Sequence, residues 1–126
     1  MLEYTYYPDT SCIITKITGY VKLDEVYSYI DRVIEDDKID KPFYEIVDFS
    51  NIENFDFGYY ESNNFITKLK DMKDQKGCKG SILIADNDLT QGMSNMFQSI
   101  GECKGVKVYI VHSLDEAMDN VVKNAS

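Results

Sequence analysis

The sequence is poor in basic residues and in proline, with two prolines among 126 residues. It has 13 lysines and arginines and 22 aspartates and glutamates, so the net charge is -9. Arg32 is the single arginine. A nucleic-acid-binding protein needs a basic surface to displace the counterions of the phosphates, and anionic membrane surfaces also attract basic segments. The composition therefore excludes nucleic acid as a partner and disfavours an anionic membrane surface.

Long apolar runs and paired cysteines are also absent. The apolar runs are too short to span a bilayer, and Met1–Tyr7 has neither the basic start nor the apolar core of a signal peptide. These features predict a cytoplasmic protein without a membrane span. The three cysteines, Cys12, Cys78 and Cys103, include no CxxC pair. This pattern predicts free thiols, no structural zinc and no cofactor.

What is present is a regular alternation of strand and helix patterns. Met1–Tyr7 and Cys12–Val21 are rich in β-branched and aromatic residues and flank a turn at Pro8, which predicts a β-hairpin. Later apolar runs predict buried strands, and segments with apolar residues at helical spacing predict helices. The later strands are expected at 43–49, 81–85 and 106–111, and the helices at 23–37, 59–75, 89–102 and 113–122.

This order, ββαβαβαβα, predicts a single α/β domain over residues 1–126 with a mixed, mostly parallel sheet and about four helices. It resembles the STAS domain (sulfate transporter and anti-sigma factor antagonist). In STAS proteins two aspartates flank the loop after a central strand, and Asp-Ser-Ser-Gly opens the next helix. Here "YEIVDFSNIENFDFGYYESNN" has Asp48 at the predicted strand end and Asp56 eight positions later.

The second half of the chain resembles a sporulation anti-sigma factor antagonist-like branch of that superfamily. The similar segments are "ILIADNDLTQGMSNMFQSI" and "VKVYIVHSLDEAMDNVV", and the resemblance covers roughly residues 12–123. It implies a STAS-like fold and a regulatory, protein-binding role. The phosphoacceptor serine of STAS proteins falls on Phe57, which cannot accept phosphate. An arginine that the branch often carries in the third helix is replaced by Asn95, so an anion contact there would lose its charge.

The segment around the missing acceptor is the first candidate site. Asp56, Phe57, Gly58, Tyr59 and Tyr60 are expected to form a partner surface, because aromatic side chains are favoured at interface cores. The alternative is that some of these aromatic rings fill the core. Ser62 is a possible phosphorylation site near the helix start, although the neighbouring carboxylates of Asp56 and Glu61 argue against it.

Other candidate residues follow the later strands. Thr90, Gly92 and Asn95 form a possible ligand or anion site, with Thr90 as helix cap; the alternative is an ordinary capped helix. Asp48, Asp86 and Asp88 have side chains that could bind a metal ion, but short polar residues are ordinary at strand ends, and no metal site is predicted. His112, the single histidine, lies in a predicted loop after a strand, and a lone histidine there gives no evidence of a catalytic triad.

The leading functional hypothesis is a non-catalytic regulatory domain of the anti-sigma-antagonist-like type that binds a protein partner or itself. The alternative is a protein that binds a small apolar, lipid-like ligand in a pocket lined by methionines and tyrosines. No constellation of nucleophile, base and oxyanion donor is visible, so an enzyme is not expected. A homodimer is expected from the tyrosines of the first strand, Tyr4, Tyr6 and Tyr7.

Overall fold

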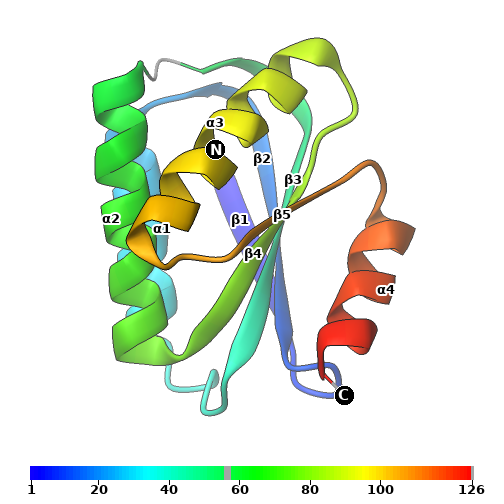
Figure 1. Ribbon diagram of the computed structural model, residues 1–126. Helices are drawn as coiled ribbons and strands as arrows, with labels where there is room; N and C mark the ends of the chain where they lie inside the picture. The colour runs from blue at the N-terminus through cyan, green and yellow to red at the C-terminus, as the bar shows by residue number, and fades with distance from the viewer. Residues whose placement is uncertain (56–57, 126) are drawn as a thin grey trace.

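The protein has an α/β fold built on one five-stranded sheet, and the computed structural model describes residues 1–55 and 58–125 (Figure 1). The strands lie in the order β1-β2-β3-β4-β5, with β1 antiparallel to β2 and all other neighbours parallel. The predicted order ββαβαβαβα is confirmed. The strands are β1 (Leu2–Tyr7), β2 (Cys12–Val21), β3 (Phe43–Phe55), β4 (Cys78–Ile84) and β5 (Val108–Val111). The helices are α1 (Leu23–Glu35), α2 (Tyr59–Lys76), α3 (Asp88–Lys104) and α4 (Leu114–Ala125).

The helices cover the two faces of the sheet unequally. Helices α1, α2 and α3 pack on one face and α4 packs alone on the other (Figure 1). Because β3 and β4 are covered on both faces, they carry buried apolar residues at successive positions, as central parallel strands do. The larger core includes Ile13, Ile30, Phe43, Ile66, Leu83 and Phe97, and the smaller core under α4 includes Cys12, Ile46, Ile82, Ala117 and Val121.

Strand β3 is longer than the sequence predicted, because it runs past Phe49 to Phe55. Its neighbour β4 ends at Ile84, which pairs with Asp48, but the ten-residue β2 continues beside β3 until Val21 pairs with Phe55. The expectation that Asp48 closes the strand is therefore wrong, and Asp48 lies inside it. The extra pairing partner comes from a distant part of the chain, so the local apolar pattern did not reveal it.

Two helix ends follow their sequence signals. Helix α2 ends at Gly77, whose φ of 86° lies in the left-handed region that glycine adopts without strain, and its N–H donates to the carbonyl of Lys73. At the start of α4 the Ser113 hydroxyl accepts a hydrogen bond from the N–H of Glu116 at 3.1 Å. Ser113 therefore caps α4.

The buried face of α1 includes a tyrosine among its apolar residues. Val26, Tyr29, Ile30 and Val33 are buried, whereas Tyr27 is only half-buried. Tyr29 lies on the core side because its hydroxyl has hydrogen-bond partners inside the core. Helical spacing of apolar residues alone does not predict such a polar contact.

Three further features concern residues 1–55 and 58–125 only. No helix in these ranges is long and apolar enough to cross a membrane. No three His, Cys, Asp or Glu side chains in them are grouped so as to hold a metal ion. Cys12 and Cys78 are buried, Cys103 is exposed, and all three are free thiols.

Candidate protein-interaction surface

All four helices begin at the same edge of the sheet, which we call the carboxyl edge. It is the edge at which the parallel strands β2 to β5 end, and each of these strands is followed directly by a helix. In open α/β sheets, ligands bind beyond the carboxyl ends of the strands. The residues that start α1, α2, α3 and α4 therefore make up the first candidate surface.

The start of α2 carries part of the predicted partner site. Gly58 is the N-cap residue, and its N–H donates to a carboxylate oxygen of Glu61 at 3.0 Å. Tyr60 is 73% exposed, so its ring does not fill the core. Tyr59 begins the helix, while Asp56 and Phe57 lie outside the described residues. The sequence alternative of core filling thus does not apply to Tyr60.

Ser62, the possible phosphorylation site, is fully buried one turn into α2. Its hydroxyl has no hydrogen-bond partner among the described residues. A kinase needs an accessible hydroxyl in an extended segment, so phosphorylation of Ser62 would require the first turn of α2 to open. Phosphorylation of Ser62 therefore stays a prediction, and the buried position of its hydroxyl does not favour it.

At the start of α3 the residue that caps the helix is Asn87, three positions before the expected Thr90. The Asn87 side chain accepts the N–H of Thr90 at 3.0 Å, and the Thr90 hydroxyl donates back to Asn87. Thr90 is fully buried in this cap, whereas Gly92 and Asn95 are exposed further along the helix. The N–H and the hydroxyl of Thr90, which were expected to bind an anion, therefore form hydrogen bonds with Asn87 instead.

Replacing Asn87 tests this cap. Asn87→Ala is expected to lower the free energy of unfolding by about 1 kcal/mol, because the N–H of Thr90 loses its acceptor. Asn95→Ala, on the exposed face of the same helix, is expected to change it by less than about 0.5 kcal/mol. Urea denaturation of both variants measures the difference, and equal effects would contradict the assignment of the cap.

The carboxyl edge is acidic. The first turns of the four helices carry acidic and no basic residues, whereas their last turns, at the opposite edge, carry basic residues together with acidic ones. This distribution suits the helix dipoles, and it also gives the edge a negative potential toward a partner. The acidic residues are Asp24, Glu25, Glu61, Asp88, Asp115 and Glu116, and the basic ones are Arg32, Lys73, Lys76, Lys104 and Lys123.

Exposed apolar side chains gather at the same edge. Of the seven large apolar side chains that are exposed in the described part of the chain, four belong to strand ends or helix starts there. Exposed aromatic and aliphatic groups within a charged rim are the usual composition of a protein-binding surface. The four are Tyr20, Tyr60, Leu89 and Leu114. Met1 lies near the same edge, beside Asp24 and Glu25 of α1, whereas Tyr7 and Val122 lie elsewhere.

The side chains considered for metal binding or catalysis serve local structure. Asp48 accepts hydrogen bonds from both the N–H and the hydroxyl of Ser50, at 2.9 and 2.6 Å. Asp86 accepts from the side-chain amide of Asn87 at 3.2 Å. The Nδ1 atom of His112 lies 3.2 Å from the carbonyl oxygen of Ala85, so this ring links the ends of β4 and β5.

A buried polar cluster, which the sequence analysis missed, lies between α1 and the sheet. It consists of Thr15 on β2, Glu45 on β3, Ser81 on β4 and Tyr29 on α1, and all four side chains are buried. The Tyr29 hydroxyl donates to one carboxylate oxygen of Glu45, and the Ser81 hydroxyl donates to the other at 2.6 Å. The Thr15 hydroxyl lies 2.6 Å from that of Tyr29. The side-chain hydrogen bonds of this cluster therefore connect α1 to the three strands β2, β3 and β4.

Burial dominates the electrostatics of this cluster. It raises the pKa of Glu45 above its usual 4.5, and the hydrogen bonds from Ser81 and Tyr29 oppose this shift. The pKa of Tyr29 is raised well above 10 by burial and then by the charge of Glu45. Burial and Glu45 also raise the pKa of the Cys78 thiol, which stays protonated. A charged residue within the apolar run of β3 was the one signal in the sequence, but its partners are remote in the chain.

A small enclosed cavity adjoins Tyr29 and Glu45. Its volume is about 20 Å³, and its remaining walls are apolar. That is room for about one water molecule, whereas small-molecule sites typically measure hundreds of cubic ångströms. A lipid-like ligand would fit between α1 and the sheet only after the core repacked, so apolar ligand binding stays a prediction.

The comparisons with known proteins identify the fold. The unphosphorylated form of the anti-sigma factor antagonist SpoIIAA superposes with a TM-score of 0.60 at 9% identity, covering 98% of both chains. An uncharacterised DUF3478 protein with a SpoIIAA-like fold, from Shewanella loihica, gives 0.60 at 11% identity over 96% of this chain and 92% of its own. The phosphorylated form of the Bacillus cell fate determinant SpoIIAA gives 0.57 at 12% identity over 96% and 99%.

The sequence itself matches no protein-family model and no curated protein. At 9–12% identity the solved structures establish the fold and leave the activity open. The predicted STAS-like architecture is thus confirmed as a SpoIIAA-like fold.

Proposed function

We propose that this protein is a non-catalytic regulatory domain that binds a protein partner through the carboxyl edge, around the start of α2. The observation that carries the proposal is the exposed ring of Tyr60 on the first turn of α2, in a fold shared with an anti-sigma factor antagonist. An aromatic side chain exposed to this degree gains stabilisation only when another surface covers it. Its position beside Gly58 matches the segment singled out by the sequence.

The chemistry of the edge specifies the kind of partner. Six carboxylates on the first helical turns attract a basic surface. Tyr60 and Leu89 offer apolar area to anchor it. The partner we propose therefore presents lysines or arginines around an apolar patch, and complex formation slows as salt rises.

Control of the interaction is proposed to differ from that of SpoIIAA, which exists in phosphorylated and unphosphorylated forms. By the sequence resemblance, Phe57 occupies the acceptor position and cannot be phosphorylated. Ser62 is close in sequence but buried. Binding is therefore proposed to be constitutive, or to be controlled through the partner.

Replacing the exposed tyrosine tests the surface. With the tagged protein as bait, the partner is captured from a lysate of the source organism, purified and titrated by calorimetry. Tyr60→Ala is expected to weaken binding at least about fivefold, because a central aromatic anchor contributes more than about 1 kcal/mol. The double variant at Tyr59 and Tyr60 is expected to weaken it further.

The matched control is Val122→Ala, which removes an apolar side chain that is 64% exposed on the last turns of α4, away from the carboxyl edge. It is expected to leave the affinity unchanged. Circular dichroism of each variant verifies that the fold is retained. Unchanged partner binding by folded Tyr60→Ala would refute the proposed surface.

A further inference from the structure

The outer edge of β1 presents unpaired backbone groups. Met1 and Thr18 exchange both backbone hydrogen bonds, at 2.7 and 2.9 Å, so they form a hydrogen-bonded pair of the antiparallel ladder. Such pairs alternate along a ladder. By this alternation, Thr5 bonds to β2, while the N–H and C=O groups of Tyr4 and Tyr6 point away from the sheet.

The free part of this edge is short and bounded at both ends. Arg32 donates to the carbonyl of Leu2 at 3.2 Å, which occupies the outward group at one end. Pro8 follows the strand at the other end and has no N–H to donate. The available backbone groups are therefore those of Tyr4 and Tyr6, placed symmetrically about Thr5.

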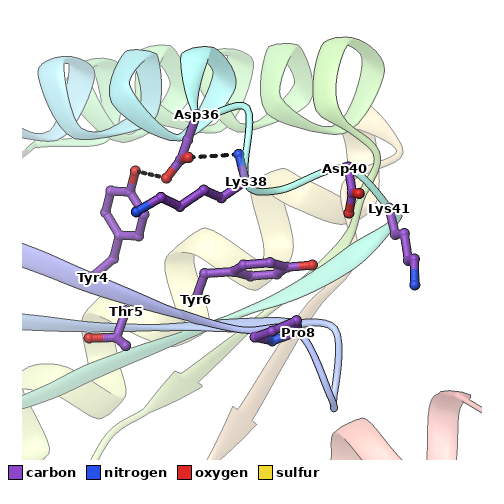
Figure 2. Close-up of a pocket in the computed structure, with 8 residues that line it drawn as sticks. All are labelled: Tyr4, Thr5, Tyr6, Pro8, Asp36, Lys38, Asp40 and Lys41. Atoms are coloured by element: carbon purple, nitrogen blue, oxygen red, sulfur yellow. Dashed lines mark hydrogen bonds between the residues drawn. The ribbon is translucent and has the colours of Figure 1, made fainter.

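A groove runs along this edge, with a volume of about 830 Å³. Figure 2 shows Tyr4 and Tyr6 reaching from β1 toward residues 36–41, the segment between α1 and β3 that overhangs the strand. The Tyr4 hydroxyl donates to Asp36 at 2.7 Å, which holds its ring upright on the strand (Figure 2). Burial and this carboxylate raise the pKa of Tyr4 to about 12. The edge is thus ordered and accessible.

We propose that two copies of this chain pair antiparallel along β1, with Thr5 of each copy on the twofold axis. In this register Tyr4 of one copy faces Tyr6 of the other, and the two pairs exchange four backbone hydrogen bonds. The symmetry of the free groups about Thr5 makes the edge complementary to itself. The two five-stranded sheets then form one continuous sheet, and an exposed edge that invites aggregation is closed.

The charges agree with pairing to a second copy. Glu3 is the one charged residue of β1, and in this register it faces Tyr7 of the second copy and not another glutamate. Cross-strand aromatic pairs such as Tyr4 with Tyr6 add stability. The groove is also neutral in a chain of net charge -9, since its lining has two carboxylates and two lysines. They are Asp36, Lys38, Asp40 and Lys41.

The pairing does not involve the carboxyl edge, so it is independent of the proposed partner surface. A twofold axis normal to the sheet reverses the direction of β2 to β5 in the second copy. The two carboxyl edges therefore point to opposite ends of the dimer. A dimer of this kind presents two separated partner sites.

Charge placed at Thr5 tests the register. Its side chain is exposed on the face of β1 away from α1, so a change there spares the core. Thr5→Lys and Thr5→Glu each oppose like charges across the axis and are expected to weaken dimerisation about fivefold. An equimolar mixture of the two variants is expected to restore it as a heterodimer. Ser99→Lys, exposed on α3, adds the same charge elsewhere and is the control.

Sedimentation equilibrium over a range of concentrations measures the dissociation constant of each variant. Hydrogen exchange supplies a second readout, because the amides of Tyr4 and Tyr6 are expected to slow with rising protein concentration while that of Thr5 does not change. If the wild-type chain stays monomeric, the proposal is overturned. The remaining candidate to pair with the edge of β1 is then a strand of another protein. A dimer with the same affinity in wild type, Thr5→Lys, Thr5→Glu and their mixture also overturns it.

Discussion

Tyr29→Phe is expected to lower the free energy of unfolding by about 2–3 kcal/mol, although it removes a single oxygen atom. The lost hydroxyl is the donor to one carboxylate oxygen of Glu45 and the neighbour of the Thr15 hydroxyl. Both groups are buried and left unsatisfied, and an unsatisfied buried polar group costs about 1–3 kcal/mol, or more when charged. Denaturation in urea at pH 7 measures the effect.

The loss is also expected to depend on pH. Burial raises the folded-state pKa of Glu45 above its usual 4.5, so the folded chain holds this proton more tightly than the unfolded chain. Its contribution to stability is therefore full below about pH 4.5 and falls as the pH rises through the folded-state pKa. Tyr29→Phe removes a donor to the carboxylate and raises that pKa further. The variant should thus lose more stability at pH 7 than at pH 5.

Tyr27→Phe provides the matched control on the same helix. Its ring is half-buried and burial raises its pKa, but it does not belong to the cluster around Glu45. Its unfolding free energy should stay within about 0.5 kcal/mol of wild type at both pH values. If Tyr29→Phe behaved like this control, the cluster would contribute nothing to stability.

Gly101→Ala is expected to destabilise the protein by about 1–3 kcal/mol, in spite of the higher helix propensity of alanine. A Cβ atom at this position of α3 would lie 2.7 Å from the carbonyl oxygen of Val106 and 3.1 Å from a methyl group of Val108. The backbones of Gly101 and Val106 cannot separate easily, since the N–H of Val106 donates to the carbonyl of Gly101 at 2.9 Å. The helix would have to move away from β5.

Gly92→Ala, nine residues earlier in the same helix, should have the opposite effect. Its Cβ would meet nothing within 4 Å, and the position is exposed. Alanine in a helix interior is then favoured over glycine by up to about 1 kcal/mol. Thermal denaturation of the two variants compares them directly. A gain in stability from Gly101→Ala would show that α3 and the segment before β5 do not approach each other closely.

Most of the fold was predictable because its signals are local. The alternation of strand and helix patterns predicts a mainly parallel sheet, and Gly77 and Ser113 mark helix ends through their own backbone and side-chain chemistry. The position of the α3 cap was wrong by three residues, because both Asn87 and Thr90 are good cap formers and the pattern does not choose between them.

The candidate surface was predictable only in part. The resemblance singled out Gly58 and Tyr60, but nothing in the spacing showed that Tyr60 is exposed while Ser62 is buried. Both lie within the first turns of one helix, and the packing of α2 on the sheet decides which of them faces the core.

By itself, the sequence determined the class of fold, the acidic character of the chain and the positions of most elements, because these depend on composition and on short-range periodicity. The tertiary structure alone decided the length of β3, the cluster around Glu45 and the free edge of β1. Each of these depends on residues far apart in the chain: β3 on its pairing with β2, Glu45 on Tyr29 and Ser81, and the edge on Arg32 and the ladder to Thr18. Such contacts form only when the whole sheet and its helices pack, so no local pattern encodes them.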